Sequence, residues 1–459
     1  MKWRISFFIM MVSLFFLTRD SLLAEFSTVQ KLTLGLLVAA VYLWVASPLP
    51  SGATSILLIA LMMLLGLADG VEEAVVGFLS PALYFIIMLS FISHSLVKVG
   101  IDRVIVRLLV KISRSGPGPI VCGLPVFIAV LPIILPSAVA RFKILLPLLI
   151  RLNTYFGFGE KSLFKKFSLY VIGMMNQNAT MIIFTGGGFP VLASQLLSDY
   201  GVADIGWLEW FGRIAPPLWF GLLIVTIFVW HFLKATAKDD EWGDERQELP
   251  LEEKEQVSMP LVFWIAVIGF LLMIVAWIIT DREQVPLVLP PMLLVVLYAL
   301  PKMGLINNNV IRSYDWENFL LLGASFSLGM LMSRNGTAKE LAEQLLELVP
   351  QDGNMVLKVL FIALFIFVLR FLFVVPSSAV IVIFPIVISY AELIGIAPVN
   401  LSFLVVMIIG GMMVLPIHSP TTFYAFETGV FTKKEQYVIG VFSSFIILIM
   451  AVIAALYYW

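Results

Sequence analysis

The chain has 459 residues, of which 61% are hydrophobic and only 13% are charged, and its mean hydropathy is +1.02. This composition excludes an ordinary soluble protein and indicates a polytopic membrane protein that is embedded in a lipid bilayer. The net charge of −1 gives no reason to expect nucleic acid binding, and the single Cys122 excludes an intramolecular disulfide.

Apolar segments recur along the whole chain and predict an all-α fold with about eleven transmembrane segments in a cell membrane. The first, 4–19, follows Lys2 and Arg4 and is expected to be an uncleaved helix within an N-terminal unit, 1–30. Further spans are expected at 31–47, 53–68, 78–98, 167–199, 212–234, 258–280, 285–301, 316–335, 399–430 and 435–458, with hairpins at 118–155 and 354–395. The two hairpins are expected to re-enter the membrane rather than cross it.

A charged segment, 235–257, lies near the middle of the chain and predicts an exposed linker. Lys and Arg are concentrated in loops that would share its side, which is therefore expected to be cytoplasmic. The linker separates two regions, 31–234 and 258–459, in which similar sequence features occur in the same order. Each has a Pro-Ser pair in an apolar hairpin and a Gly- or Pro-rich break in a later span. This order predicts two inverted repeats of the kind found in many transporters.

The two hairpin tips and the two breaks are the expected sites of chemistry. Non-helical backbone inside a membrane is tolerated where it is buried in protein or lines a cavity. Helix N-termini there favour anions, and free carbonyl groups favour cations. Two sets, each of one tip and one break, predict one anion site flanked by two cation sites.

Two stretches, "FLLLGASFSLGMLMSRNGTAKELA" and "LPIHSPTTFYAFETGVFTKKEQYVIG", resemble the divalent anion:sodium symporters, a family of dicarboxylate, citrate and sulfate transporters. The resemblance spans nearly the whole chain. It implies a homodimeric secondary transporter of small anions that works by an elevator motion, with sodium as coupling ion and no other cofactor. The Ser-Asn-Thr sequence typical of that family's tips is replaced here by Ser137-Ala138-Val139 and Pro376-Ser377-Ser378.

The pattern of tips and breaks, together with the resemblance, assigns candidate site residues. Those expected to bind substrate are Ser137, Arg141, Gly187, Gly188, Ser377, Ser378, Ser419, Thr421 and Thr422. Those expected to bind an ion are Pro136, Ala138, Thr185, Gly186, Pro376, Pro416 and His418. No other metal site is expected.

Arg141 is the most unusual residue of the first hairpin because a charge within an apolar segment is costly. Its guanidinium could bind an anionic substrate, or its charge could replace a bound sodium ion. Arg370 could play a matching part from the second hairpin, and Lys143 is a weaker candidate. The alternative for each is pairing with carbonyl groups or reaching the membrane surface.

Other polar residues leave further alternatives open. His418 could support proton coupling or make a local polar contact. Asn176, Gln177, Asn178 and Thr180 could bind a ligand or join helices, whereas His94 and Glu427 are expected to be structural. No nucleophile–base set or Walker-type loop is present, so neither an enzyme nor an ATP-driven pump is expected. Competing functions are proton-coupled transport, anion exchange, arsenite or metalloid efflux, and a membrane receptor without transport.

Overall fold

The computed structural model describes residues 25–46, 48–236, 260–280, 285–349, 353–373 and 375–459. Within these ranges the secondary structure is helical and contains no strand. The predicted span 4–19 lies outside the described residues, as does all of the predicted linker except Ala235 and Thr236. By length and composition, five described helices could cross a membrane: Pro81–Lys98, Trp207–Thr236, Leu261–Ile279, Pro376–Ile394 and Lys433–Tyr457.

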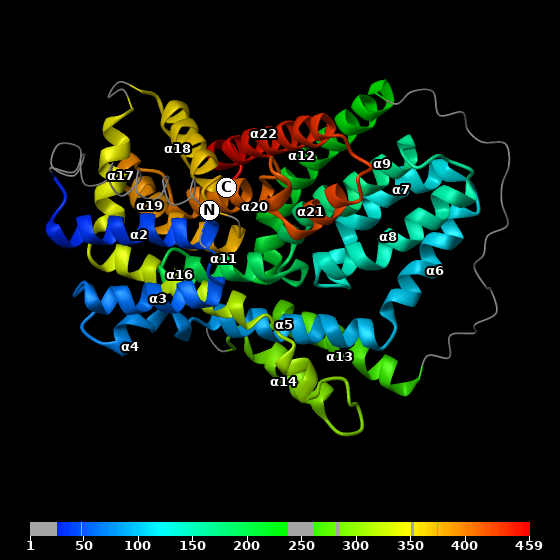
Figure 1. Ribbon diagram of the computed structural model, residues 1–459, viewed down its shortest axis with the longest axis horizontal. Coiled ribbons are helices and arrows are strands. Elements are labelled where there is room, and N and C mark those ends of the chain that lie inside the picture. Colours follow the sequence, from blue (N-terminus) through cyan, green and yellow to red (C-terminus); the bar gives the residue numbers. More distant parts are fainter. Residues whose placement is uncertain (1–24, 47, 237–259, 281–284, 350–352, 374) are drawn as a thin grey trace.

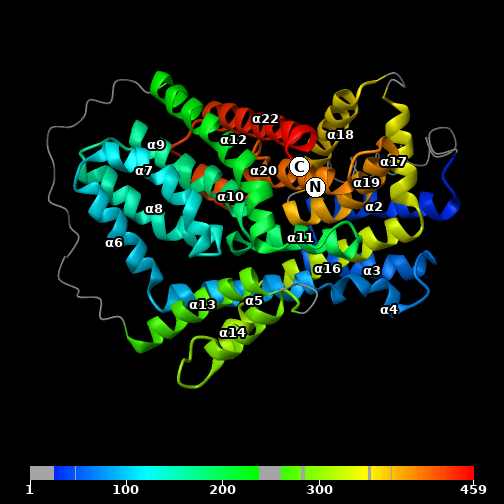
Figure 2. The same cartoon turned by 180° about the vertical axis from the view of Figure 1, so that it is seen from behind.

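One layer of the molecule consists of helices that lie together at the bottom of Figure 1 and again in Figure 2. They are α3 (Ser51–Leu64), α5 (Pro81–Lys98), α13 (Leu261–Ile279) and α14 (Leu289–Ala299), and α16 (Trp316–Arg334) packs on α3. A short 3-10 turn, Val76–Leu79, lies against α16, where the Gly77 amide donates to Ser327 Oγ at 3.0 Å. A Cβ at Gly77 would lie 2.2 Å from the Ser327 backbone nitrogen, so only glycine permits this approach.

The second layer contains the two hairpins and the two interrupted spans, and it lies above the first in Figure 1. Long helices α12 (Trp207–Thr236) and α22 (Lys433–Tyr457) pack on one another along its outer side. The first part of the second broken span, α20 (Pro398–Gly411), packs directly on α22. Helix α2 (Thr28–Ala46) packs on α3 and α16.

Two steep helices, α6 (Ile101–Ser113) and α17 (Thr337–Glu347), lie at opposite ends of the molecule in both views. Each follows a helix of the first layer and leads to a hairpin. Each begins after a glycine in the left-handed conformation, Gly100 at φ 100° and Gly336 at φ 75°. The sequence echo between the two regions is therefore matched by the same local turn at equivalent points.

The first hairpin consists of α7 (Pro117–Val130) and α8 (Ala138–Tyr155), joined by a tip that contains the 3-10 turn Leu131–Ile133 and ends at Ser137. The second pairs α18 (Met355–Arg370) and α19 (Pro376–Ile394). Its tip precedes Pro376-Ser377 rather than containing them. Pro376 is the first residue of α19, where a missing amide hydrogen costs nothing.

The interruptions lie where the glycine and proline residues predict them. The first span runs from α9 (Leu163–Tyr170) through a π-helical turn, Val171–Met175, and α10 (Asn176–Ala179) to α11 (Gly188–Asp199). Two 3-10 turns, Thr180–Ile182 and Phe184–Gly186, form the break between α10 and α11. The second break joins α20 to α21 (Pro420–Glu427) through extended residues and the turn Pro416–His418.

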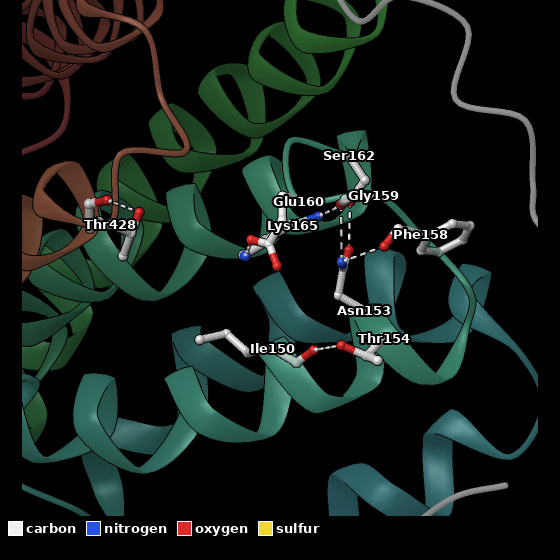
Figure 3. A network of polar contacts seen from close by, with 10 residues as sticks. Ile150, Asn153, Thr154, Phe158, Gly159, Glu160, Ser162, Lys165 and Thr428 are labelled. Atoms are coloured by element: carbon white, nitrogen blue, oxygen red, sulfur yellow. Dashed lines mark hydrogen bonds and ion pairs between the residues drawn. The ribbon is translucent and has the colours of Figure 1, made fainter. Parts of the chain in front are cut away.

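A polar network fixes the loop between the first hairpin and the first broken span (Figure 3). The Asn153 side chain donates to the Phe158 and Gly159 carbonyl oxygens at 3.0 and 3.1 Å, and it accepts from Ser162 Oγ at 2.5 Å. Ser162 also caps α9, accepting from the Lys165 amide at 3.1 Å. The exit of the hairpin is thus tied to the start of the broken span.

Candidate substrate cavity

A cavity of about 640 Å³ lies between the two layers. Its lining comes from α5 and α16 on one side and from the hairpin tips and breaks on the other. In both overall views α5 runs below α8 and α11. The cavity therefore lies at the boundary between the first layer and the elements that the sequence singled out.

Four helices begin at the wall of this cavity. The first residue of α8, α11, α19 and α21 lines it in each case, namely Ala138, Gly188, Pro376 and Pro420. Helices α8 and α21 carry side-chain caps, because Ser137 Oγ accepts from the Ala140 amide at 3.2 Å and Ser419 Oγ accepts from the Thr422 amide at 3.1 Å. Helices α11 and α19 have no side-chain cap, so their first-turn amides can face a ligand.

Lys143 gives the cavity a positive charge. It lines the wall one turn into α8, and its Nζ lies 5.9 Å from the centre of the Tyr424 ring. Among the described residues that line the cavity there is no aspartate or glutamate. Polar side chains that can donate hydrogen bonds complete the wall: Ser90, Ser93, His94, Ser137, Gln177, Thr180, Asn318 and Ser377.

The structure brings eight of the predicted site residues to this cavity: Pro136, Ser137, Ala138, Gly186, Gly187, Gly188, Pro376 and Ser377. They come from both tips and from the first break. Elements from both regions, 31–234 and 258–459, therefore meet at one cavity. Of the second break, only Pro420 reaches the lining.

Four other predicted residues do not line this cavity. Thr421 Oγ1 donates to the Gly173 carbonyl oxygen at 2.8 Å, which joins the second break to the π-helical turn of the first span. Ser419 Oγ donates to Thr422 Oγ1 at 2.9 Å within the second break. Ser378 lines a separate cavity of about 210 Å³ beside α2 and α3.

Of the remaining predicted residues, Pro416 is half-buried, whereas His418, Thr185 and Arg141 are buried. The His418 Nδ1 atom accepts from the Leu415 amide at 3.3 Å, which is a local contact within the Pro416–His418 turn. Thr185 is fully buried within the first break. Arg141 and Arg370 are also fully buried, and their guanidinium groups donate to backbone carbonyl groups instead of lining the cavity. Lys143, two residues after Arg141, takes the position at the cavity that was considered for Arg141.

The sequence reasoning missed the contribution of α5 and α16. Ser90, Ser93 and His94 line the cavity together, although His94 was expected to be structural. Their spacing of three and four residues places them on one face of a helix. That polar stripe in an apolar span was the signal that could have identified them.

A family profile described as "Sodium:sulfate symporter transmembrane region" matches residues 2–459. The chain is 22% identical over 456 residues to a Cupriavidus necator protein described as "Membrane protein", covering 93% of this chain and 86% of that protein. It is 24% identical over 251 residues to a Bacillus subtilis protein named "Putative malate transporter YflS", covering 52% of this chain and 51% of that protein.

Proposed function

Because the chain belongs to the sodium:sulfate symporter family, we propose that it is a secondary transporter of small di- or tricarboxylates or of sulfate-like oxyanions. The observation that carries the proposal is the cavity in which four helix N-termini and Lys143 meet without a lining carboxylate among the described residues. Its volume of about 640 Å³ suits a small organic anion together with water.

The charge of the cavity favours a divalent anion. Each helix N-terminus carries the equivalent of roughly half a positive charge, and its free amides can donate to oxygen atoms. Lys143 adds a full charge on a flexible side chain. Ser137 and Ser377 lie at opposite tips, so a dicarboxylate could place one carboxylate near each repeat. Malate is the first substrate to test, because a relative carries that name.

We further propose that the layer with the hairpins and breaks moves against α5 and α16 in an elevator motion. The cavity lies at the boundary between the two layers, so sliding one layer past the other would carry a bound anion with it. The steep helices α6 and α17 connect the layers at opposite ends and are suited to follow such a movement. In a homodimer, the first layer would stay fixed while the layer with the hairpins and breaks moves.

Uptake of labelled malate, succinate and sulfate into proteoliposomes that contain the same unlabelled anion tests the proposal. Lys143→Gln removes the lysine charge from the cavity, and losing a charged hydrogen bond of about 1.5–3 kcal/mol should raise the KM roughly 10- to 100-fold. Lys143→Arg should retain most of the uptake because it retains the charge. Lys111→Gln, at an exposed position on α6, is the matched control and should leave uptake unchanged.

Three results would contradict the proposal. The first is no uptake of any of these anions by the native protein. The second is an unchanged KM in Lys143→Gln, which would remove the cavity from the transport route. The third is anion binding, detected as thermal stabilisation, without any flux, which would indicate a receptor instead of a transporter.

A further inference from the structure

The Arg141 guanidinium joins the first tip to the first broken span. Its Nη1 donates to the Leu135 carbonyl oxygen of the tip at 2.5 Å and to the Gly186 carbonyl oxygen of the break at 3.4 Å. Its Nε donates to Asn176 Oδ1 at 2.6 Å, and its Nη2 to the Asn176 carbonyl oxygen at 3.5 Å. Asn176 is held in turn, since its Nδ2 donates to the Ala138 carbonyl oxygen at 2.9 Å.

The Arg370 guanidinium makes the corresponding set of contacts in the second repeat. Its Nη1 donates to the Phe373 carbonyl oxygen of the tip, and its Nη2 donates to the His418 carbonyl oxygen of the break at 3.1 Å. Its Nε donates to the Ile409 carbonyl oxygen at 3.2 Å, near the end of α20. Each arginine therefore binds a tip, a break and the helix that precedes the break.

The two arginines reach these equivalent places from different sides of their hairpins. Arg141 follows the tip, on α8, whereas Arg370 precedes the tip, at the end of α18. Both junctions thus contain a guanidinium among carbonyl groups, but the two arginines come from positions that are not equivalent in the two hairpins. Each junction of tip and break therefore contains a cationic group.

Both charges are buried without a carboxylate. Arg141 and Arg370 each have 0% exposure, and within the described part of the chain neither forms an ion pair with an aspartate or glutamate. Converging carbonyl oxygens are the ligands that hard cations such as sodium take in transporters. Here those oxygens already accept hydrogen bonds from a guanidinium, so the two junctions do not fit an additional sodium ion.

Building on the proposed function, we propose that Arg141 and Arg370 serve as tethered cations at the two junctions, so that this transporter moves anions without binding sodium there. A tethered charge travels with the protein and returns with it in every cycle. It therefore draws no free energy from a sodium gradient. Net flux would then follow the anion gradients, as in exchange of one anion for another.

The native protein provides the first test. Uptake of labelled malate into proteoliposomes that contain unlabelled malate should agree within about twofold when external sodium is replaced by potassium or choline. Unfolding midpoints in sodium, potassium and choline chloride should also coincide at equal ionic strength. A tenfold loss of uptake without sodium, or stabilisation of the native protein by sodium alone, would overturn the inference.

Variants provide the second test. Arg141→Ser and Arg370→Ser each release carbonyl oxygens, so sodium should raise their unfolding midpoints by roughly 2 °C or more while choline does not. Guanidinium chloride at low millimolar concentration should also raise the unfolding midpoints of these two serine variants. Arg141→Lys keeps a charge at the junction and should not respond to sodium, and Arg107→Ser, at an exposed site on α6, should match the native protein.

A serine variant that folds but responds equally to all three salts would contradict the assignment. If a serine variant does not fold, the native protein still decides the question through its own sodium response. If the native protein transports none of the anions, the proposed function fails, yet the thermal measurements still test whether sodium binds. The two failures are therefore distinguishable.

Discussion

The buried ion pair between Lys166 and Glu435 offers a quantitative test of how the two repeats are joined. Lys166 lies on α9 and Glu435 on the first turn of α22, with 2.6 Å between Lys166 Nζ and Glu435 Oε1. Their side chains are only 8% and 6% exposed. At an effective dielectric constant of about 20, the attraction is about 6 kcal/mol before the cost of desolvation is subtracted.

Lys166→Met should destabilise the protein because it leaves a buried carboxylate without its cation. Removing one partner of a buried pair costs about 3–5 kcal/mol. The lower end, about 3 kcal/mol, is expected here because Glu435 Oε2 also accepts from the Thr432 amide at 2.8 Å. With an unfolding entropy of about 2 cal/mol/K per residue, this corresponds to a midpoint about 3 °C lower.

A double-mutant cycle separates the pair from its surroundings. Glu435→Gln added to Lys166→Met should recover about 2 °C, since a neutral amide is less costly to bury than a carboxylate. Lys339→Met removes one partner of an exposed pair, whose nitrogen and oxygen lie 3.7 Å apart, and should change the midpoint by less than 0.5 °C, as expected for a surface ion pair of about 0.5 kcal/mol. A Lys166→Met midpoint within 0.5 °C of the native value, or no recovery in the double variant, would refute this reasoning.

Two further substitutions test the first break by thermal unfolding and malate uptake. Gly186→Ala would place a Cβ 2.1 Å from the Thr180 carbonyl oxygen, so it should cost about 3 kcal/mol and reduce uptake at least tenfold, whereas Gly123→Ala, with no atom within 4 Å, should do neither. Normal uptake in Gly186→Ala would show that the break can relax. Trp210→Phe removes the hydrogen bond from Nε1 to the Met181 carbonyl oxygen, 2.8 Å long and fully buried. It should cost about 2 kcal/mol with little change in KM, and an unchanged midpoint would argue against this bond.

Much of the architecture follows from local sequence. Apolar length predicts the helices, and the observed bounds of α2, α12, α16 and α22 differ from the expected spans by a few residues. The breaks follow from glycine and proline, because a Cβ at Gly186 has no room and Pro420 begins a new helix. Re-entry of the hairpins stays a prediction, and the linker lies almost wholly outside the described residues.

The orientation of the charged side chains was decided by tertiary structure alone. Arg141 and Lys143 are two residues apart on one helix, so they cannot share a face, but the sequence does not say which of them faces the cavity. The fold places Lys143 at the cavity and Arg141 among carbonyl groups from segments up to 45 residues away. Arg370 was considered for a matching part from the sequence, but only the fold shows that it contacts the second tip and break from the other side of its hairpin.

The sequence by itself determined that this is a helical membrane protein and predicted a hairpin and a break in each of two regions, because apolar length and helix-breaking residues act locally. Only the tertiary structure decided which polar groups meet. Four helix starts, a lysine and a polar stripe on α5 converge on one cavity, while two arginines turn away from it. These contacts join segments from both halves of the chain, and their geometry depends on how the layers pack.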